Sequence, residues 1–207
     1  MTVPAKPWID RLRLWTQDLY IACMADAGLP AAPVGTSNLR PTVRKYTLFQ
    51  SNPAAPPSLR MHATRHSDSL VMRNRDYNQA KGRFSQRLAR GLLLDLDVLQ
   101  DESLLELVKN AKLHPTGGVE SYVNQLGANL HGMEWVAYRS VELSAVRNCI
   151  THNGQVWHAG QVARLDALRS AVYSPPVVGT RIDIQLEHLF AYKTAVRTLL
   201  NRCSEAR

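Results

Sequence analysis

Apolar residues recur at helical spacing along most of this 207-residue chain. Near the N-terminus Trp8, Leu12 and Leu19 share one face of an amphipathic helix that the pattern predicts over residues 7–27, and Pro30 ends it. The same i, i+3, i+4, i+7 spacing returns after residue 70. It predicts five further helices joined by short turns, at residues 77–111 (one long helix, or two with a break), 119–130, 133–151, 162–172 and 182–200.

Between the first helix and the others, residues 30–69 lose this period and become rich in proline, serine and alanine, as in SNPAAPPS at 51–58. Such a composition predicts an extended connector. Within it the stretch VRKYTLFQ at 43–50 could form a strand or an anchor, although a single strand has no evident partner in the sequence.

These elements predict an all-α protein, a bundle of four to five helices with an N-terminal helix and a Pro-rich connector before it. We assign the N-terminal helix and the basic, Pro-rich connector to residues 1–70 and the bundle to residues 71–207. No internal repeat is evident.

Composition bounds the class of protein. Hydrophobic residues make up 45% of the chain and charged residues 20%, and no unbroken apolar run approaches the length of a bilayer span. The N-terminal helix carries charges among its apolar residues, unlike a secretory signal, so we expect a cytoplasmic protein with no membrane segment. The cysteines are odd in number and far apart, which predicts reduced thiols rather than disulfides or a zinc site, at Cys23, Cys149 and Cys203.

The net charge of +8 is unevenly distributed. Residues 38–91 hold eleven basic and two acidic residues, whereas residues 92–120 hold six acidic and two basic ones. Arginine pairs bidentately with phosphate, so nucleic acid or a nucleotide is the first partner to consider. A solvated basic surface, or an arm that binds an acidic protein, is the alternative. The candidate RNA-binding residues are Arg73, Arg75, Lys81, Arg83 and Arg87.

A compact polar group closes the predicted helix 133–151, where residues 146–155 read VRNCITHNGQ. Asn148 and His152 are four residues apart and so face the same side of a helix, while Arg147 is rotated by about 100° from Asn148. Basic residues near a helix C-terminus, followed by Asn-Gly, are also ordinary capping chemistry. That reading explains each residue singly but not their combination.

The string R-N-x-x-x-H, here Arg147, Asn148 and His152, resembles the motif of the HEPN superfamily. The resemblance implies a small bundle of four or five helices with the motif late in the sequence, and residues 76–204 fit that description. Antitoxin-paired members of the superfamily often carry a tyrosine two residues after the histidine, where this chain has Gly154.

The resemblance also implies a function, because many HEPN proteins are metal-independent ribonucleases whose motifs meet across a twofold dimer interface. In such a site Arg147 would stabilise charge on the phosphate, Asn148 would orient the imidazole or the phosphate, and His152 would act as general acid or base. The product would be a 2′,3′-cyclic phosphate. No metal is expected, since the sequence has no ligand spacing typical of one, and no cofactor is implied. A toxin–antitoxin or anti-phage setting follows from the same resemblance.

Residues around the motif have simpler explanations. We expect His158 in a solvent-exposed loop, Cys149 in the core, and Trp135 and Tyr138 in core or dimer contacts. Glu142 could pair with Arg147 or with Arg139.

Two other functions stay open. The same helical dimer could be a non-catalytic HEPN-like module that binds RNA, a nucleotide or a protein as a subunit of a larger complex. The N-terminal helix and its connector could also dock the chain onto such a complex.

Overall fold

The computed structural model describes residues 6–28, 36–39, 70–128, 130–168 and 175–205, with the backbone alone for residues 6, 36–39 and 70–77. Its contacts divide the chain into two compact units, residues 30–82 and residues 1–29 together with 83–207. No helix among the described residues is both long enough and apolar enough to span a bilayer.

The smaller unit contains a two-stranded antiparallel hairpin that the sequence pattern does not predict. Strand β1 (Thr36–Leu39) pairs with β2 (Leu70–Arg73), with Thr36 opposite Arg73 and Leu39 opposite Leu70. Helix α2 (Asn74–Asn110) follows β2 directly and continues into the larger unit. The strand or anchor expected at 43–50 lies outside the described residues.

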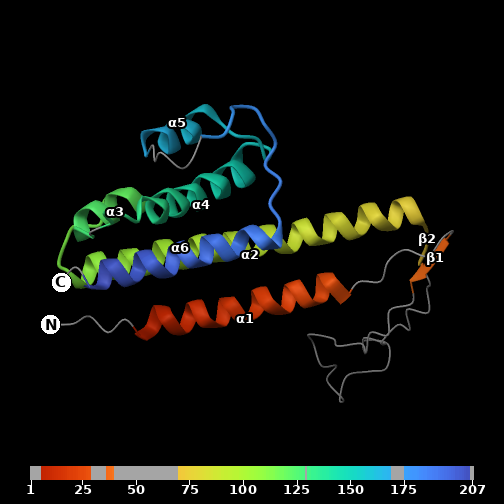
Figure 1. Cartoon of the computed structure of the whole chain (residues 1–207), viewed down its shortest axis with the longest axis horizontal. Helices are drawn as coiled ribbons and strands as arrows, with labels where there is room; N and C mark the ends of the chain where they lie inside the picture. Colours follow the sequence, from red (N-terminus) through yellow and green to blue (C-terminus); the bar gives the residue numbers. More distant parts are fainter. Residues whose placement is uncertain (1–5, 29–35, 40–69, 129, 169–174, 206–207) are drawn as a thin grey trace, which may run out of the picture. The chain divides into compact units, whose positions relative to one another are not determined.

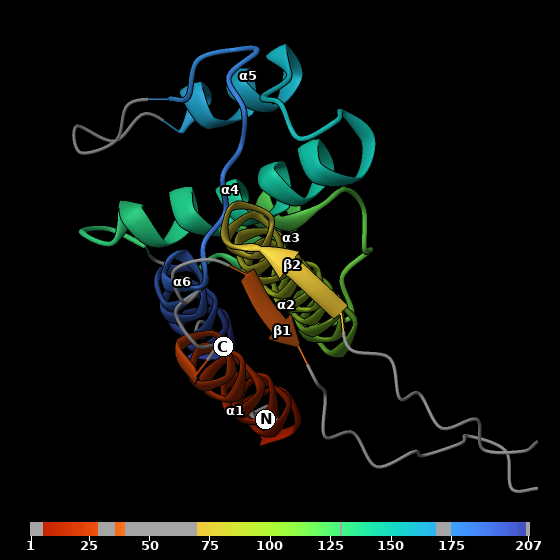
Figure 2. The ribbon, with the colours of Figure 1, turned by 90° about the vertical axis from the view of Figure 1, so that its right-hand side faces the viewer.

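The larger unit is helical throughout, which confirms the all-α class. Besides α2 from Arg83 onward, it contains α1 (Lys6–Gly28), α3 (Val119–Leu126), α4 (Glu134–His152), α5 (Ala159–Ala167) and α6 (Leu186–Glu205). Helix α4 packs against α6, α6 against α1, and both α3 and α5 against α4. Within this unit α1, α2 and α6 run side by side (Figure 1), and α4 crosses them, since Figure 2 views those three nearly end-on and α4 from its side.

The five helices expected after residue 70 are all present among the described residues. Helix α2 is one continuous helix, which decides against the alternative of two helices with a break. Helix α1 packs with the bundle rather than with the connector, so the contacts group the chain differently from the expected division into 1–70 and 71–207. Its buried stripe explains this grouping: Trp15 is 5% exposed, and its Nε1–H donates to the carbonyl oxygen of Leu92 at 2.9 Å.

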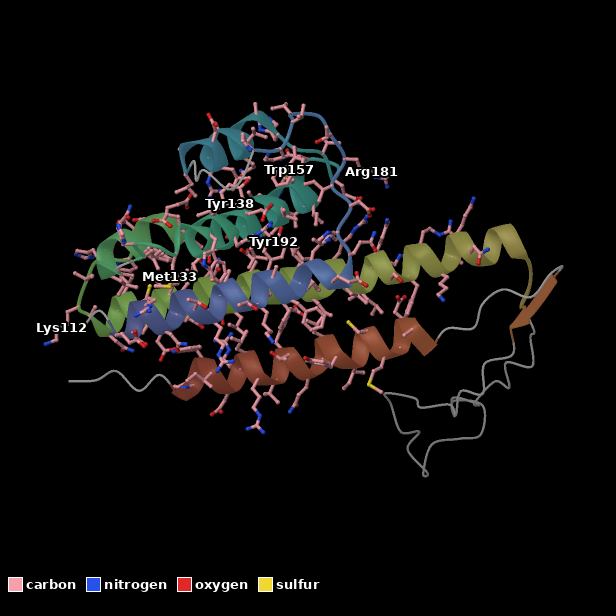
Figure 3. The ribbon with its side chains drawn as sticks, in the orientation of Figure 1. Lys112, Met133, Tyr138, Trp157, Arg181 and Tyr192 are labelled. Atoms are coloured by element: carbon pink, nitrogen blue, oxygen red, sulfur yellow. The ribbon has the colours of Figure 1, made fainter. Side chains whose placement is uncertain are left out.

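Polar contacts join helix α2 to α4, and one of them is fully buried. The side chain of Gln100 is fully buried and donates from Nε2 to the carbonyl oxygen of Ser140 at 3.1 Å. Tyr138 of α4 and Tyr192 of α6 are also buried (Figure 3), and burial raises the pKa of Tyr192 well above its usual value. These contacts hold α4 in a fixed position between α2 and α6.

The segment after α4 is tied to the segment before α6. Val156 and Arg181 form an isolated antiparallel bridge, and the backbone N–H of Trp157 donates to the carbonyl oxygen of Thr180 at 3.0 Å. Trp157 and Arg181 are labelled in Figure 3. Because the bridge follows within a few residues of His152, it limits where the chain can go after the motif.

The three cysteines are free thiols, as expected. Cys149 and Cys203 are buried and Cys23 is half-buried. Burial raises the pKa of the Cys203 thiol to about 12, so this thiol stays protonated and unreactive at neutral pH.

Candidate functional site

The predicted catalytic residues lie in the last turns of α4. The helix ends directly after His152, because the backbone N–H groups of Asn153 and Gln155 both donate to the carbonyl oxygen of Cys149 at 3.1 Å. Gly154 and Gln155 then adopt left-handed φ angles of 61° and 69°. Glycine adopts this conformation easily and glutamine does not, so the helix end is a sharply defined turn rather than a frayed one.

Arg147 and Asn148 line an open cleft of about 600 Å³. Its other walls come from α2, from the start of α3 and from α5, so four helices contribute to one hollow. The cleft is strongly polar. It is lined by two arginines, Arg147 and Arg164, and by four carboxylates, Asp97, Asp101, Glu102 and Glu120.

The guanidinium of Arg147 is held by neighbours on two sides. Its Nη1 donates to Oδ1 of Asn148 at 2.8 Å, and its Nε lies 3.6 Å from Oδ2 of Asp97. The Arg147 side chain is 39% exposed, so its outer part faces solvent in the cleft. Its Nη2 donates no hydrogen bond within the described part of the chain, and it is therefore free to meet an anion.

Asp97 is the most enclosed of the cleft carboxylates, with 8% of its surface exposed. Burial raises its pKa above 3.8, and this effect outweighs the opposing influence of the hydrogen bond from Ser144 Oγ, at 2.6 Å, and of the nearby Arg147. Burial likewise raises the pKa of Asp101, again opposed by Arg147. The base of the cleft therefore holds two carboxyl groups that ionise less readily than usual, beside one arginine.

The lining of the cleft includes a bidentate ion pair between α3 and α5. Arg164 donates to the two carboxylate oxygens of Glu120, from Nε at 2.9 Å and from Nη2 at 2.8 Å. Burial alone would raise the pKa of Glu120, but these bonds outweigh it and the pKa lies below 4.5. Arg164 is thus already neutralised, which leaves Arg147 as the cleft arginine with a free donor.

His152 is exposed on the last turn of α4 and does not line this cleft. The structure therefore brings Arg147 and Asn148 together in a single chain but leaves His152 outside their hollow. No described hydrogen bond involves the imidazole of His152. Its ring is available to a partner outside the chain.

The candidate RNA-binding residues fall in both units. The side chains of Arg73 and Arg75 lie outside the described residues, and Lys81 belongs to the smaller unit. Arg83 and Arg87 lie one turn apart on the exposed side of α2 in the larger unit. The sequence prediction for all five residues stays untested by these positions.

The simpler explanations for the residues near the motif can be checked directly. Glu142 forms an ion pair with Arg139 rather than with Arg147. Tyr138 is buried and Trp135 packs partly buried against the core, as expected. His158 is exposed and caps α5, because its Nδ1 accepts a hydrogen bond from the backbone N–H of Gly160 at 3.3 Å.

The residues that surround Arg147 were not predicted from the sequence. Asp97, Glu120 and Arg164 come from three different helices, and only packing brings them together. One signal was present: Asp97 interrupts an apolar row on α2, between Leu93 and Leu104 at helical spacing, where a polar residue needs a buried partner. Among the described residues no group of three or more metal-ligating side chains exists.

No protein-family model, curated protein or solved structure matches this chain. The fold and the cleft define an all-α protein with two partly exposed arginines in an acid-lined hollow. The HEPN resemblance stays a prediction from the motif.

Proposed function

We propose that this chain is a HEPN-type, metal-independent endoribonuclease that acts as a homodimer. The observation that carries the proposal is the environment of Arg147. Its guanidinium lies in an open cleft at the end of α4 and is positioned by Asn148 and Asp97, and its Nη2 has no hydrogen-bond acceptor among the described residues. A guanidinium fixed in this way is suited to stabilise charge that develops on a phosphate oxygen.

Asn148 supports this role of Arg147 through a contact that differs from the expected one. Its Oδ1 accepts from Arg147, so it orients the guanidinium rather than the imidazole. His152 would act as general acid or base on the 2′-hydroxyl or on the leaving 5′-oxygen. Attack by the 2′-oxygen on phosphorus forms one P–O bond and breaks the bond to the 5′-oxygen, which leaves a 2′,3′-cyclic phosphate.

A second copy of the chain completes this proposal. His152 is exposed and lies outside the cleft that holds Arg147, so a twofold contact between two α4 ends would place the histidine of one chain near the arginine of the other. The exposed Arg83 and Arg87 would then add phosphate contacts along α2. We place this activity in the cytoplasm, in a toxin–antitoxin or defence setting, with an antitoxin or defence-complex subunit as a further partner.

The experiment is cleavage of a mixed-sequence RNA in EDTA by the wild-type protein and by His152→Ala, with His114→Ala as a matched control. His114 is an exposed histidine in the turn after α2, away from the cleft lining. We expect cleavage by the wild type and by His114→Ala, with 2′,3′-cyclic ends, and none by His152→Ala. Equal cleavage by all three preparations would reject the catalytic assignment, because it would then come from a contaminant or from other residues.

One observation favours a second function, a non-catalytic RNA-, nucleotide- or protein-binding module. Four carboxylates and two arginines line the cleft, and both arginines already have acidic neighbours, so the hollow itself does not attract RNA strongly. Steeply salt-dependent RNA binding without any cleavage in the same assay would favour this module over the nuclease.

A further inference from the structure

Helix α1 carries apolar side chains on more than the face that packs into the core. Trp8, Leu12, Trp15 and Leu19 form the core stripe and are at most 5% exposed. Outside this stripe Ile9 is 44%, Tyr20 is 55% and Ile21 is 63% exposed. A helix that only anchors itself to a bundle needs one apolar stripe, so these exposed side chains are unexplained by the fold.

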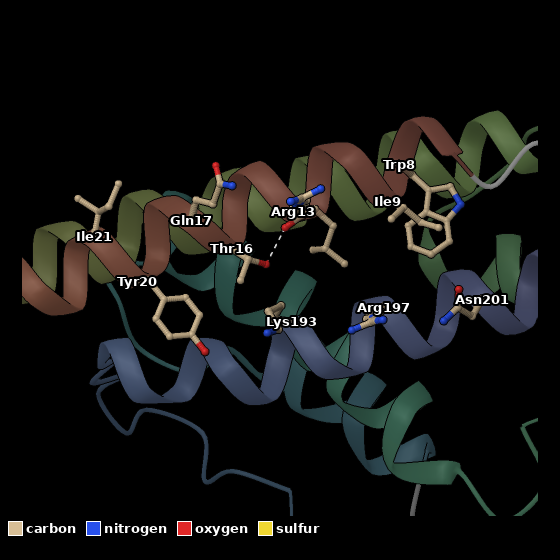
Figure 4. Close-up of a pocket in the computed structure, with 11 residues that line it drawn as sticks. Trp8, Ile9, Arg13, Thr16, Gln17, Tyr20, Ile21, Lys193, Arg197 and Asn201 are labelled. Carbon is tan, nitrogen blue, oxygen red and sulfur yellow. Dashed lines mark hydrogen bonds between the residues drawn. The ribbon is translucent and has the colours of Figure 1, made fainter.

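These three exposed residues line a groove of about 770 Å³ between α1 and α6 (Figure 4). Both helices belong to the larger unit. Tyr20 reaches from α1 toward α6 in Figure 4, and its ring meets that of Phe190 edge-on at a centroid distance of 5.5 Å. This contact forms one end of the groove, and the opposite end lies beside Trp8 and Asn201.

The groove has an apolar floor and a basic rim. Arg13 projects from α1, and Lys193 and Arg197 project from α6 one helical turn apart. No carboxylate is among its lining residues, and no described ion pair involves these three cations. Lys193 lies 6.0 Å from the centre of the Phe190 ring, a weak contact that leaves its charge unneutralised.

We propose that this groove binds an amphipathic helix with acidic residues, supplied by a partner protein. The lining of α1 runs from Trp8 to Ile21, which corresponds to about 20 Å along a helix axis and matches a partner helix of about four turns. Apolar residues at i, i+3 and i+7 of that helix would cover Ile9 and Tyr20. Acidic residues at i and i+4 would meet Lys193 and Arg197, which share that spacing.

Charge and shape together favour this occupant over two others. A second copy of the chain would bring an equally basic rim against the first, which like-charge repulsion disfavours. A flat lipid surface reaches exposed side chains such as Met24 more easily than the floor of a groove between two helices. The proposal is independent of the ribonuclease, because no groove residue belongs to the cleft of Arg147.

The test is a selection from a displayed library of helix-forming peptides, each about four turns long, against the full-length protein and against Lys193→Glu/Arg197→Glu. A second pair of reversals, Lys109→Glu/Arg181→Glu, changes the net charge equally at exposed positions outside the groove. We expect the wild type and the control to enrich acidic amphipathic peptides. We expect the groove variant to bind those peptides at least roughly tenfold more weakly in fluorescence anisotropy.

The apolar half of the proposal has its own matched pair. Ile21→Ser alters a groove residue that is 63% exposed, and Met24→Ser alters a residue that is 74% exposed and does not line the groove. Since both side chains are exposed, neither variant is expected to unfold the protein. We expect Ile21→Ser to weaken peptide binding and Met24→Ser to leave it unchanged.

Four outcomes would overturn the proposal. The first is that no peptide is enriched over the selection against Lys193→Glu/Arg197→Glu, and the second is that neutral or basic peptides are enriched. The third is that the protein floats with phosphatidylcholine–phosphatidylglycerol vesicles and Ile21→Ser abolishes this flotation. The fourth is that the protein self-associates in sedimentation and the groove reversal Lys193→Glu/Arg197→Glu abolishes this self-association. The last two would assign the surface to lipid or to a second copy.

Discussion

Asp97 offers the sharpest physical test of the cleft. It is a buried carboxylate that accepts from Ser144 and neighbours Arg147, yet burial is the dominant influence on its pKa, which lies above 3.8. The variant Asp97→Asn keeps the shape of the side chain and an oxygen acceptor for Ser144. It removes the charge alone.

The contributions to the free energy of unfolding can be estimated. Exchanging a hydrogen bond to a carboxylate for one to an amide loses about 1 kcal/mol, and the ion pair with half-exposed Arg147 contributes at most about 1 kcal/mol. Against these losses stands the desolvation of a buried ion, several kcal/mol before any compensation. We therefore expect the free energy of unfolding of Asp97→Asn at pH 7 to equal that of the wild type or to exceed it by up to about 1 kcal/mol.

The pH dependence carries the stronger prediction. Because the folded pKa of Asp97 exceeds the unfolded value of 3.8, the native state binds more protons between those two pKa values, and wild-type stability falls as pH rises through that window. Below pH 3.8 the carboxyl of Asp97 is protonated in both the folded and the unfolded state, so its ionisation no longer changes the stability of the wild type. The variant should gain relative stability with rising pH, by about 1.4 kcal/mol for each pKa unit that separates the two states.

The assay is urea unfolding followed by circular dichroism from pH 3.5 to 7, for the wild type, Asp97→Asn and Asp95→Asn. Asp95 is an exposed carboxylate on the same helix, so its variant controls for the loss of one charge. We expect the difference in the free energy of unfolding between the wild type and Asp97→Asn to grow with rising pH. We expect the difference between the wild type and Asp95→Asn to stay constant. Parallel curves for all three proteins would show that burial does not control the ionisation of Asp97, and the account of the cleft would fail with it.

Three further predictions concern the site. A refolded mixture of Arg147→Ala and His152→Ala chains should cleave RNA although neither variant does alone, since mixed dimers contain one intact copy of each residue. If the mixture is as inactive as the two variants, the arginine and the histidine of one site come from the same chain. Glu120→Gln should cost about 1 kcal/mol at pH 7 by urea unfolding, because the depressed folded pKa stabilises the fold above pH 4.5, and that difference should vanish as pH falls through the folded pKa. Replacing Arg83 and Arg87 by alanine should lower the slope of log RNA affinity against log salt by up to about 1.4, and an unchanged slope would remove them from the interface.

The helices could be predicted from the sequence because each buries an apolar stripe with its own period. In α1 the pattern included Trp8, Leu12, Trp15 and Leu19, which are buried, and also Ile21 and Met24, which are exposed. The β1–β2 hairpin could not be predicted, since TSNL and LVMR lack alternation and are separated by a long Pro-rich segment. A local sequence pattern predicts helices that bury an apolar face of their own. It does not predict pairing between strands that lie far apart in the sequence.

The candidate site divides in the same way. Arg147 and Asn148 were identified because they are neighbours in the chain, and their hydrogen bond is local. Asp97 and Glu120 reach the cleft only because α2 and α3 pack around α4, which a motif cannot express. The acidic character of the cleft, which bears most directly on RNA binding, is therefore a property of the tertiary structure.

Helical geometry explains why His152 lies apart from Arg147. Five residues along an α-helix correspond to a rotation of about 140°, so two side chains at this spacing point to different sides, whereas Asn148 and His152 are only about 40° apart. A single phosphodiester can thus contact the free Nη2 of Arg147 and the imidazole of His152 from one chain only by wrapping around the end of α4. The proposed twofold contact would remove that requirement, because each cleft would then receive the exposed histidine of the other chain. For this reason the mixture of single variants, more than the loss of activity in either one, decides whether the motif works as a nuclease.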